Sequence, residues 1–242
     1  TEASEIPEII AKAFYIARSG RPGPVLVDIT KNAQFDELDF SYTKCKGVRS
    51  YFPKPVLDHQ KVAEAAALIN GAKKPYIVFG QGVILGQAEE LLKAVIEKTG
   101  IPAAWTILGL SALPSDHPLN VGMLGMHGNY GPNILTNECD VLIAIGMRFD
   151  DRVTGNLATY AKQAKVIHFE IDPAEVDKNV KTDVAVLGDV KESLAALLPL
   201  VEAKSHKAWH NEFKEKYKIE LESVINDELN PKGEGISMGE TI

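Results

Sequence analysis

Short apolar runs alternate with amphipathic segments over most of this chain. The apolar runs have the length and composition of strands buried on both faces. They lie at residues 75–79, 101–105, 140–146, 165–171 and 184–187. Apolar residues recur at helical spacing between and after these runs, at residues 58–70, 87–99, 132–136, 190–201 and 206–226. Gly71 and Gly100 directly follow two of these segments, as helix stop signals do. The alternation predicts an α/β fold, a doubly wound and mostly parallel sheet covered by helices on both faces.

The first part of the chain follows a different pattern. A helical pattern at residues 8–17 is followed by a nearly continuous apolar run at 24–29, which predicts a buried strand. One helix and one strand cannot bury their own apolar surfaces, so we expect residues 1–29 to be the end of another domain. Residues 30–57 are irregular and end in a proline-rich stretch, which predicts an extended linker. At the other end, residues 235–242 are expected to be the first turn of a further element.

Composition excludes several classes of protein. The 26 basic and 33 acidic residues give a formal charge of -7 without a basic block, so a nucleic-acid partner is not expected. No apolar run approaches the roughly 20 residues that cross a bilayer, and the first ten residues lack a secretion signal, so no membrane segment is expected. Cys45 and Cys139 are the two cysteines, which suits a reducing compartment. We therefore expect a cytoplasmic protein, or an organellar one in a eukaryote, without a disulfide.

Glycines follow one predicted strand and fill a later loop. Gly80-Gln81-Gly82 comes directly after the run at 75–79, where bare backbone N–H groups can approach a phosphate. It lacks the third glycine of a dinucleotide fingerprint, and a tight turn that requires positive φ is an equal alternative. The loop at residues 121–132 holds four glycines together with apolar side chains, which favours a flat ligand lying on the main chain over a mobile surface loop.

Charged residues also follow the predicted strands. Arg148 and Arg152 come after the run at 140–146, where guanidinium groups can pair with a pyrophosphate or a carboxylate. The alternative is pairing with aspartates of the same loop. Glu170 ends another strand and is the candidate acceptor for ribose hydroxyls, whereas helix capping is the simpler reading of Asp172 and Asp189.

The residue pattern contains no recognisable catalyst. The six histidines show no metal-ligand spacing, so zinc is not expected. No serine elbow, Cys-His constellation or phosphate-loop lysine occurs. From the residues alone we therefore expect a nucleotide-like ligand site without catalytic groups.

Three strings carry a family resemblance. They are SGRPGPVLVDITK at 19–31, LGMHGNYGPNILTNECDVLIAIGMRFDDRVTG at 124–155 and HFEIDPAEVDKN at 168–179. Together they resemble the large subunits of acetolactate synthase (acetohydroxyacid synthase), which are thiamine-diphosphate enzymes. The resemblance implies that 1–29 is the tail of the N-terminal pyrimidine-binding domain, 30–57 a linker and 58–201 the central FAD-binding domain. Residues 202–242 would be a linker helix and the start of the C-terminal pyrophosphate-binding domain.

The resemblance also implies a cofactor site. FAD, whose flavin performs no net redox chemistry in this family, is expected in the central domain. Thiamine diphosphate and Mg²⁺ would bind outside these residues, because the activating glutamate and the Gly-Asp-Gly motif are absent, so we expect no catalytic residue and no metal site here. The expected FAD-site residues are Arg21, Gly80, Gln81, Gly82, Thr106, Ile107, Leu124, Gly125, Met126, His127, Gly146, Met147, Arg148, Asp150, Arg152, Val153, Glu170, Ile171, Asp189 and Val190.

Substrate contacts follow from the same resemblance. Arg152 is expected to recognise the carboxylate of the second 2-oxo acid, and Lys31 to lie on the substrate channel. Met126 and Asp151 match channel positions where herbicidal inhibitors bind. One departure is Thr30, which stands where many relatives have proline, so the channel entrance is less well defined.

The implied reaction decarboxylates pyruvate and joins its two-carbon unit to a second pyruvate or to 2-oxobutyrate, in branched-chain amino-acid biosynthesis. The complete enzyme would be a homodimer or tetramer with a regulatory small subunit, and these residues alone would be inactive and would hold FAD weakly or not at all. Two alternatives stay open. One is the central domain of a pyruvate oxidase or glyoxylate carboligase type of enzyme, and the other is a stand-alone nucleotide-binding module.

Overall fold

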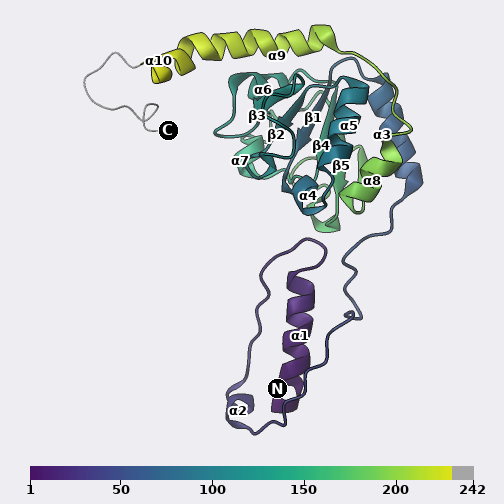
Figure 1. Cartoon of the computed structure of the whole chain (residues 1–242), viewed down its shortest axis with the longest axis vertical. Coiled ribbons are helices and arrows are strands. Elements are labelled where there is room, and N and C mark those ends of the chain that lie inside the picture. Colours follow the sequence, from purple (N-terminus) through teal and green to yellow (C-terminus); the bar gives the residue numbers. More distant parts are fainter. Residues whose placement is uncertain (231–242) are drawn as a thin grey trace. The chain divides into compact units, whose positions relative to one another are not determined.

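The computed structural model describes residues 1–230, and the chain divides into two compact units, Thr1–Val56 and Leu57–Ile242 (Figure 1). The turn expected at 235–242 lies outside the described residues. In the first unit, the short 3-10 turn η1 (Ala3–Glu5) leads into α1 (Ile6–Ala17), and α2 (Lys31–Phe35) follows. The helix expected at 8–17 is therefore confirmed.

The strand expected at 24–29 is wrong. These residues form no strand, and Leu26 is 92% exposed. A strand needs a neighbour to receive its backbone N–H and C=O groups. Among the described residues of this unit, the isolated bridge between Val48 and Tyr51 is the one ladder contact, so the apolar run has no sheet to join.

A six-stranded parallel sheet forms the centre of the second unit. Its strand order is β3-β2-β1-β4-β5-β6, and every neighbouring pair is parallel. This order confirms the doubly wound sheet. The strands are β1 (Pro75–Phe79), β2 (Ala103–Trp105), β3 (Asn120–Met123), β4 (Val141–Ile145), β5 (Lys165–Glu170) and β6 (Val184–Leu187).

The edge strand β3 was not expected. Its residues were assigned to the glycine-rich loop because they do not form an apolar run. Gly122 has φ +104 and the register with β2 shifts between Ala103 and Trp105, so the strand is irregular. Only its position beside β2 makes it a strand.

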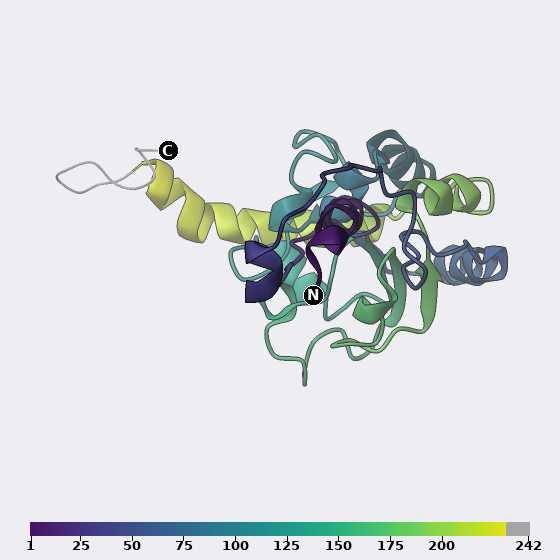
Figure 2. The ribbon, with the colours of Figure 1, turned by 90° about the horizontal axis from the view of Figure 1, so that it is seen from below.

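Helices cover both faces of the sheet. On one face, α8 contacts both α3 and α5, and Figure 2 shows the green α8 between them. On the other face α6 packs against α9. The helices expected from the pattern are present, whereas α4, α7 and also α2, which lies within the expected linker, were not anticipated. The helices are α3 (His59–Gly71), α4 (Gln81–Leu85), α5 (Glu89–Thr99), α6 (Tyr130–Leu135), α7 (Asp151–Thr154), α8 (Val190–Leu197), α9 (Lys207–Glu220) and α10 (Asn226–Leu229).

The four inner strands β1, β2, β4 and β5 contribute side chains to two hydrophobic cores. Ile77 and Phe79 of β1 point into the core beneath α3, α5 and α8, and Tyr76 and Val78 point into the core beneath α6 and α9. These four side chains are at most 1% exposed. The apolar runs at 75–79, 101–105, 140–146 and 165–171 thus correspond to strands buried on both faces, as expected. The run at 184–187 is the exception, because edge strand β6 alternates between buried and half-buried residues.

The C-terminal helix α9 is anchored on the sheet. Trp209 is buried, and its Nε1–H donates to the carbonyl oxygen of Pro75 at 2.8 Å. Its ring centroid lies 5.0 Å from that of Phe213, which in turn contacts Tyr76. Two aromatic side chains of α9 therefore complete the second core.

Candidate functional site

Six loops meet at one edge of the sheet. Because all six strands are parallel, their carboxyl ends lie at the same edge, where ligands bind in folds of this type. The predicted segments begin at these ends: the residues after Phe79, Trp105, Met123, Ile145 and Leu187, together with Glu170 at the end of β5. Arg21 and Lys31 belong to the other compact unit.

The order in which strands are added to the sheet reverses between β1 and β4, and glycines lie in the loops at this point. The N–H of Gly82 donates to the carbonyl oxygen of Gly146 at 2.8 Å. A Cβ on Gly82 would lie 2.6 Å from the Cα of Gly146, and one on Gly80 would lie 2.6 Å from the Cβ of Met147. The glycines are therefore required by close backbone approach.

The tight-turn alternative for Gly80 is wrong in its stated form. Gly80 has φ -132, so no positive φ is needed there, and the positive angle belongs to Gly146, at +58. The contact partner of Gly80 and Gly82 is a loop more than sixty residues away. Sequence reasoning could not identify that partner, because the two loops meet only when β1 and β4 pair.

Apolar side chains are exposed at this edge. Ile107, after β2, is 65% exposed, and Met126, after β3, is 60% exposed. His127 is also exposed, whereas Leu124 and Gly125 are buried beneath them. Apolar groups held in this way on a loop offer a surface for a flat ring.

The loop after β4 carries the two arginines. Arg148 Nε lies 2.8 Å from Asp150 Oδ2, so the expected alternative of pairing within the loop is confirmed for this arginine. Asp150 also caps α7 by accepting the N–H of Arg152 at 3.1 Å. Arg152 differs, because its exposed guanidinium makes no salt bridge with a carboxylate of residues 1–230, and its Nη1 lies 3.8 Å from the sulfur of Met126. It is the arginine better placed to receive an anion.

Glu170 is buried at the end of β5, at 8% exposure. Its Oε1 accepts the N–H groups of Ile171 at 2.9 Å and Asp172 at 3.1 Å, so this carboxylate holds the turn after the strand. Its Oε2 lies 3.6 Å from Nε2 of His168, but that nitrogen donates to the carbonyl oxygen of Met147 at 2.8 Å. Burial lowers the pKa of His168, so the ring is neutral and the approach to Glu170 is not an ion pair at neutral pH.

Helix capping is confirmed for both aspartates for which it was expected. Asp172 accepts the N–H of Ala174 at 3.0 Å, and Asp189 caps α8 by accepting the N–H of Lys191 at 2.9 Å. Asp189 still follows β6 at the shared edge, next to Val190. Its capping role fixes where its carboxylate lies.

Two asparagines were missed by the sequence reasoning. Asn129 accepts the N–H of Met123 at 2.9 Å and donates from Nδ2 to Glu220 Oε1 at 3.2 Å, which ties α9 to the loop after β3. Asn133 contacts the same loop from α6. The available signal was a pair of amides inside a glycine-rich stretch, where backbone groups need side-chain partners.

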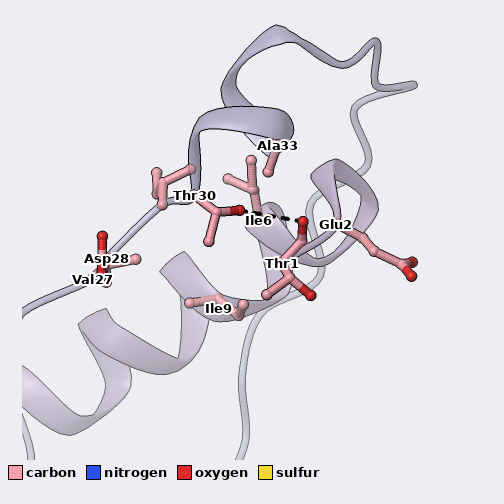
Figure 3. A pocket seen from close by; sticks show the side chains of 9 residues that line it. Thr1, Glu2, Ile6, Ile9, Val27, Asp28, Thr30 and Ala33 are labelled. Atoms are coloured by element: carbon pink, nitrogen blue, oxygen red, sulfur yellow. Dashed lines mark hydrogen bonds between the residues drawn. The ribbon is translucent and has the colours of Figure 1, made fainter.

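The remaining features do not add to this site. No group of three His, Cys, Asp or Glu residues within 1–230 is arranged to hold a metal ion, and both cysteines are free. Of the described helices, none has the length and apolar character that a bilayer crossing requires. A small hollow in the first unit is lined by Thr1, Ile6 and Val27 among others, and Thr30 Oγ1 donates to the carbonyl oxygen of Thr1 at 3.4 Å across it (Figure 3). It includes none of the predicted site residues.

Comparison with known proteins agrees with the fold and the resemblance. The family described as thiamine pyrophosphate enzyme, central domain, matches residues 62–197. The acetolactate synthase large subunit of Corynebacterium glutamicum is 45% identical over 203 residues, which cover 84% of this chain and 32% of that protein. The probable acetolactate synthase large subunit of Methanocaldococcus jannaschii is 42% identical over 231 residues, which cover 93% of this chain and 39% of that protein.

The chain thus spans between 32% and 39% of the length of these two relatives. A solved structure of a putative thiamin diphosphate-dependent enzyme from Mycobacterium smegmatis has the same fold, with a TM-score of 0.66 at 24% identity over 84% of this chain and 38% of that one. The resemblance stated from the sequence strings is confirmed by these relatives. With its parallel six-stranded sheet and a family match over residues 62–197, this chain belongs to the thiamine pyrophosphate enzymes and contains their central domain.

Proposed function

We propose that this chain is the FAD-binding segment of an acetolactate synthase. The observation that carries the proposal is the meeting of six strand ends at one edge, with bare glycine backbone, exposed apolar side chains and two arginines gathered there. The names of the relatives support the reaction, and the string at 124–155 supports the same family over the pyruvate oxidase or glyoxylate carboligase type. In this proposal residues 1–29 and 202–242 belong to the flanking thiamine-binding domains and 58–201 to the central one.

The chemistry of the edge fits an extended dinucleotide. The exposed side chains of Ile107 and Met126 suit the flat flavin ring, which would cover their apolar surface. Arg148 and Arg152 are the cations available for the pyrophosphate. Glu170 and the Asp189 turn, which follow β5 and β6, suit the adenosine end. Arg21 is proposed as a further FAD-binding residue.

The proposed reaction takes place outside these residues. Thiamine diphosphate with Mg²⁺, when bound by the flanking domains, supplies the carbanion chemistry that removes carbon dioxide from pyruvate and transfers the two-carbon unit to a second 2-oxo acid. Within this chain, Arg152 is the residue proposed to bind the carboxylate of that second acid, and Lys31 is proposed as a further substrate-binding residue. A homodimer or tetramer with a regulatory small subunit, a role in branched-chain amino-acid synthesis and a cytoplasmic or organellar location complete the proposal.

A domain exchange tests the proposal. The matching 203 residues of the Corynebacterium glutamicum large subunit are replaced by the part of this chain that they match, 84% of its length, and FAD content and acetolactate formation are measured in the purified chimera. We expect one FAD per chain and restored acetolactate formation. A folded chimera that binds thiamine diphosphate but no FAD would contradict the proposed function.

FAD binding by the isolated chain distinguishes the proposed function from a stand-alone nucleotide-binding module. Because Arg21 lies in an incomplete domain in our proposal, we expect the isolated chain to bind FAD weakly, and a titration followed by flavin fluorescence measures this. Sub-micromolar affinity of the isolated chain, together with an inactive chimera, would favour the independent module.

A further inference from the structure

A side chain of α6 holds the main chain of the loop after β3. The amide of Asn133 meets both polar groups of Gly125: the Gly125 N–H donates to Oδ1 at 3.0 Å, and Nδ2 donates to the Gly125 carbonyl oxygen at 2.9 Å. Asn133 is half-buried and Gly125 is buried, so water competes little for these hydrogen bonds. This is the pairing that a neighbouring strand would otherwise provide.

The conformation held in this way is one that only glycine adopts easily. Gly125 has φ +120, and a Cβ at this position would lie 2.8 Å from the carbonyl oxygen of Arg152. The Gly125 carbonyl oxygen also accepts the N–H of Gly128 at 2.8 Å, which closes the loop. Since a glycine main chain has the largest conformational freedom, an external clamp is needed to hold this single conformation.

Asparagine has the chemistry that this clamp requires. Its planar amide places one donor and one acceptor side by side, matching the N–H and C=O of one residue. Aspartate has the same size but lacks the donor, and alanine lacks both groups. The clamp is therefore specific to the amide.

The clamp acts on two of the residues that are exposed at the binding edge, Met126 and Arg152. The next residue, Met126, donates its N–H to the carbonyl oxygen of Arg152 at 2.7 Å, and its sulfur lies 3.8 Å from Arg152 Nη1. By holding the main chain of Gly125, Asn133 also fixes the position of Met126, which in turn contacts Arg152. An apolar side chain and a guanidinium are brought to the same place by it.

We propose that Asn133 is a positioning residue of the ligand site, whose amide orients Gly125 so that Met126 and Arg152 together receive the flat ring and the anionic group of a bound flavin dinucleotide. This inference rests on the proposed function. Asn133 does not touch the ligand itself, and it acts through the main chain of Gly125.

The chain offers a matched control. Asn137 lies just after α6, and its Oδ1 accepts the N–H of Ala161 at 2.7 Å, ahead of β5 and therefore away from the carboxyl edge. Asn133→Ala, Asn133→Asp and Asn137→Ala are compared in the full 242-residue chain. Thermal unfolding reports the stability that each variant loses. Amide hydrogen exchange at Gly125 and Met126, and titration with FAD up to millimolar concentration, report the loop and the site.

We expect faster exchange at Gly125 and Met126 in both Asn133 variants and wild-type exchange there in Asn137→Ala. The dissociation constant for FAD should rise roughly tenfold in the Asn133 variants, the equivalent of one hydrogen bond, and stay within about twofold of wild type in Asn137→Ala. Asn133→Asp removes no volume, so a matching effect in this variant excludes a cavity as the cause.

The outcomes separate the inference from the proposed function. Unchanged exchange at Gly125 and Met126 in Asn133→Ala overturns the inference whether or not FAD binds. Faster exchange with wild-type FAD affinity, or an equal loss of affinity in Asn137→Ala, also overturns it. A wild-type chain that binds no FAD even at millimolar concentration also overturns the inference about the ligand, whereas the proposed function is contradicted by a folded chimera that binds thiamine diphosphate but no FAD.

Discussion

Met126 and Arg152 contact each other through both main chain and side chain. The Met126 N–H donates to the Arg152 carbonyl oxygen at 2.7 Å, and Arg152 Nη1 lies 3.8 Å from the Met126 sulfur. The contact joins the loop after β3 to α7, which follows β4. Among the described residues, the Arg152 guanidinium makes no salt bridge, and this contact holds it beside the exposed side chain of Met126. Such an arrangement is expected where a ring and an anion bind together.

The first prediction concerns Arg152 in an active acetolactate synthase that carries these residues. Arg152→Ala should lower kcat/KM for the second 2-oxo acid about 10- to 100-fold, because one hydrogen bond to a charged group is lost, while thiamine diphosphate affinity changes little. Arg152→Lys should restore only part of the loss, since lysine lacks the planar fork. Steady-state kinetics with both 2-oxo acids and a cofactor titration measure the two effects. Equal losses in both would mean that Arg152 acts on the structure as a whole.

The second prediction concerns the glycine contact between β1 and β4. Gly82→Ala should lower the free energy of unfolding by about 1–3 kcal/mol, because the new Cβ would lie 2.6 Å from the Cα of Gly146 and neither main chain can yield freely. Gly71→Ala, at the end of α3, meets nothing within 4 Å and should be neutral or stabilising by up to about 1 kcal/mol. Urea unfolding compares them, and equal midpoints would disprove the crowding at Gly82.

The third prediction concerns the pH dependence of stability. Burial lowers the pKa of His168 below its ordinary value of 6.5, so the unfolded chain binds the proton first as the pH falls. The contribution of His168 is complete above pH 6.5 and is lost as the pH falls through this value toward the lower folded-state pKa. The pKa values of His206 and His210 are lowered in the same direction by burial.

A substitution isolates the contribution of His168 to the pH dependence of stability. In His168→Gln, unfolding free energies measured between pH 8 and pH 5 should fall less steeply than in wild type. The difference at pH 8, where imidazole is neutral in both states, measures the packing lost with the ring. Parallel curves over the whole range would show that His168 does not contribute to the pH dependence.

The fourth prediction concerns the C-terminal helix. Trp209→Ala should cost about 3–5 kcal/mol of unfolding free energy, because a buried ring and its hydrogen bond to Pro75 are both lost. Tyr217→Ala, on the same helix but with its side chain 51% exposed, should change the free energy by less than about 0.5 kcal/mol. Similar losses in both variants would mean that α9 is not anchored through Trp209.

Part of this fold could be predicted because the signals are local. The apolar run at 75–79 contains its own evidence for burial on both faces, and β1 occupies those residues with Ile77 and Tyr76 in opposite cores. Gly100 ends α5 with φ 64, as its stop signal indicated. The same reasoning failed at 24–29, because an equally apolar run forms a strand only where a neighbouring strand is present.

The candidate site, like the fold, has features that local sequence predicts and features that it does not. The sequence by itself determined which residues follow the strands and could bear ligand chemistry, among them Arg152 and Glu170. Only the tertiary structure decided that Gly82 meets Gly146, that Asn133 clamps Gly125 and that Arg152 contacts Met126. These contacts join residues from different loops or elements. Most of them depend on the order in which the parallel strands lie side by side, and no local pattern of residues encodes that order.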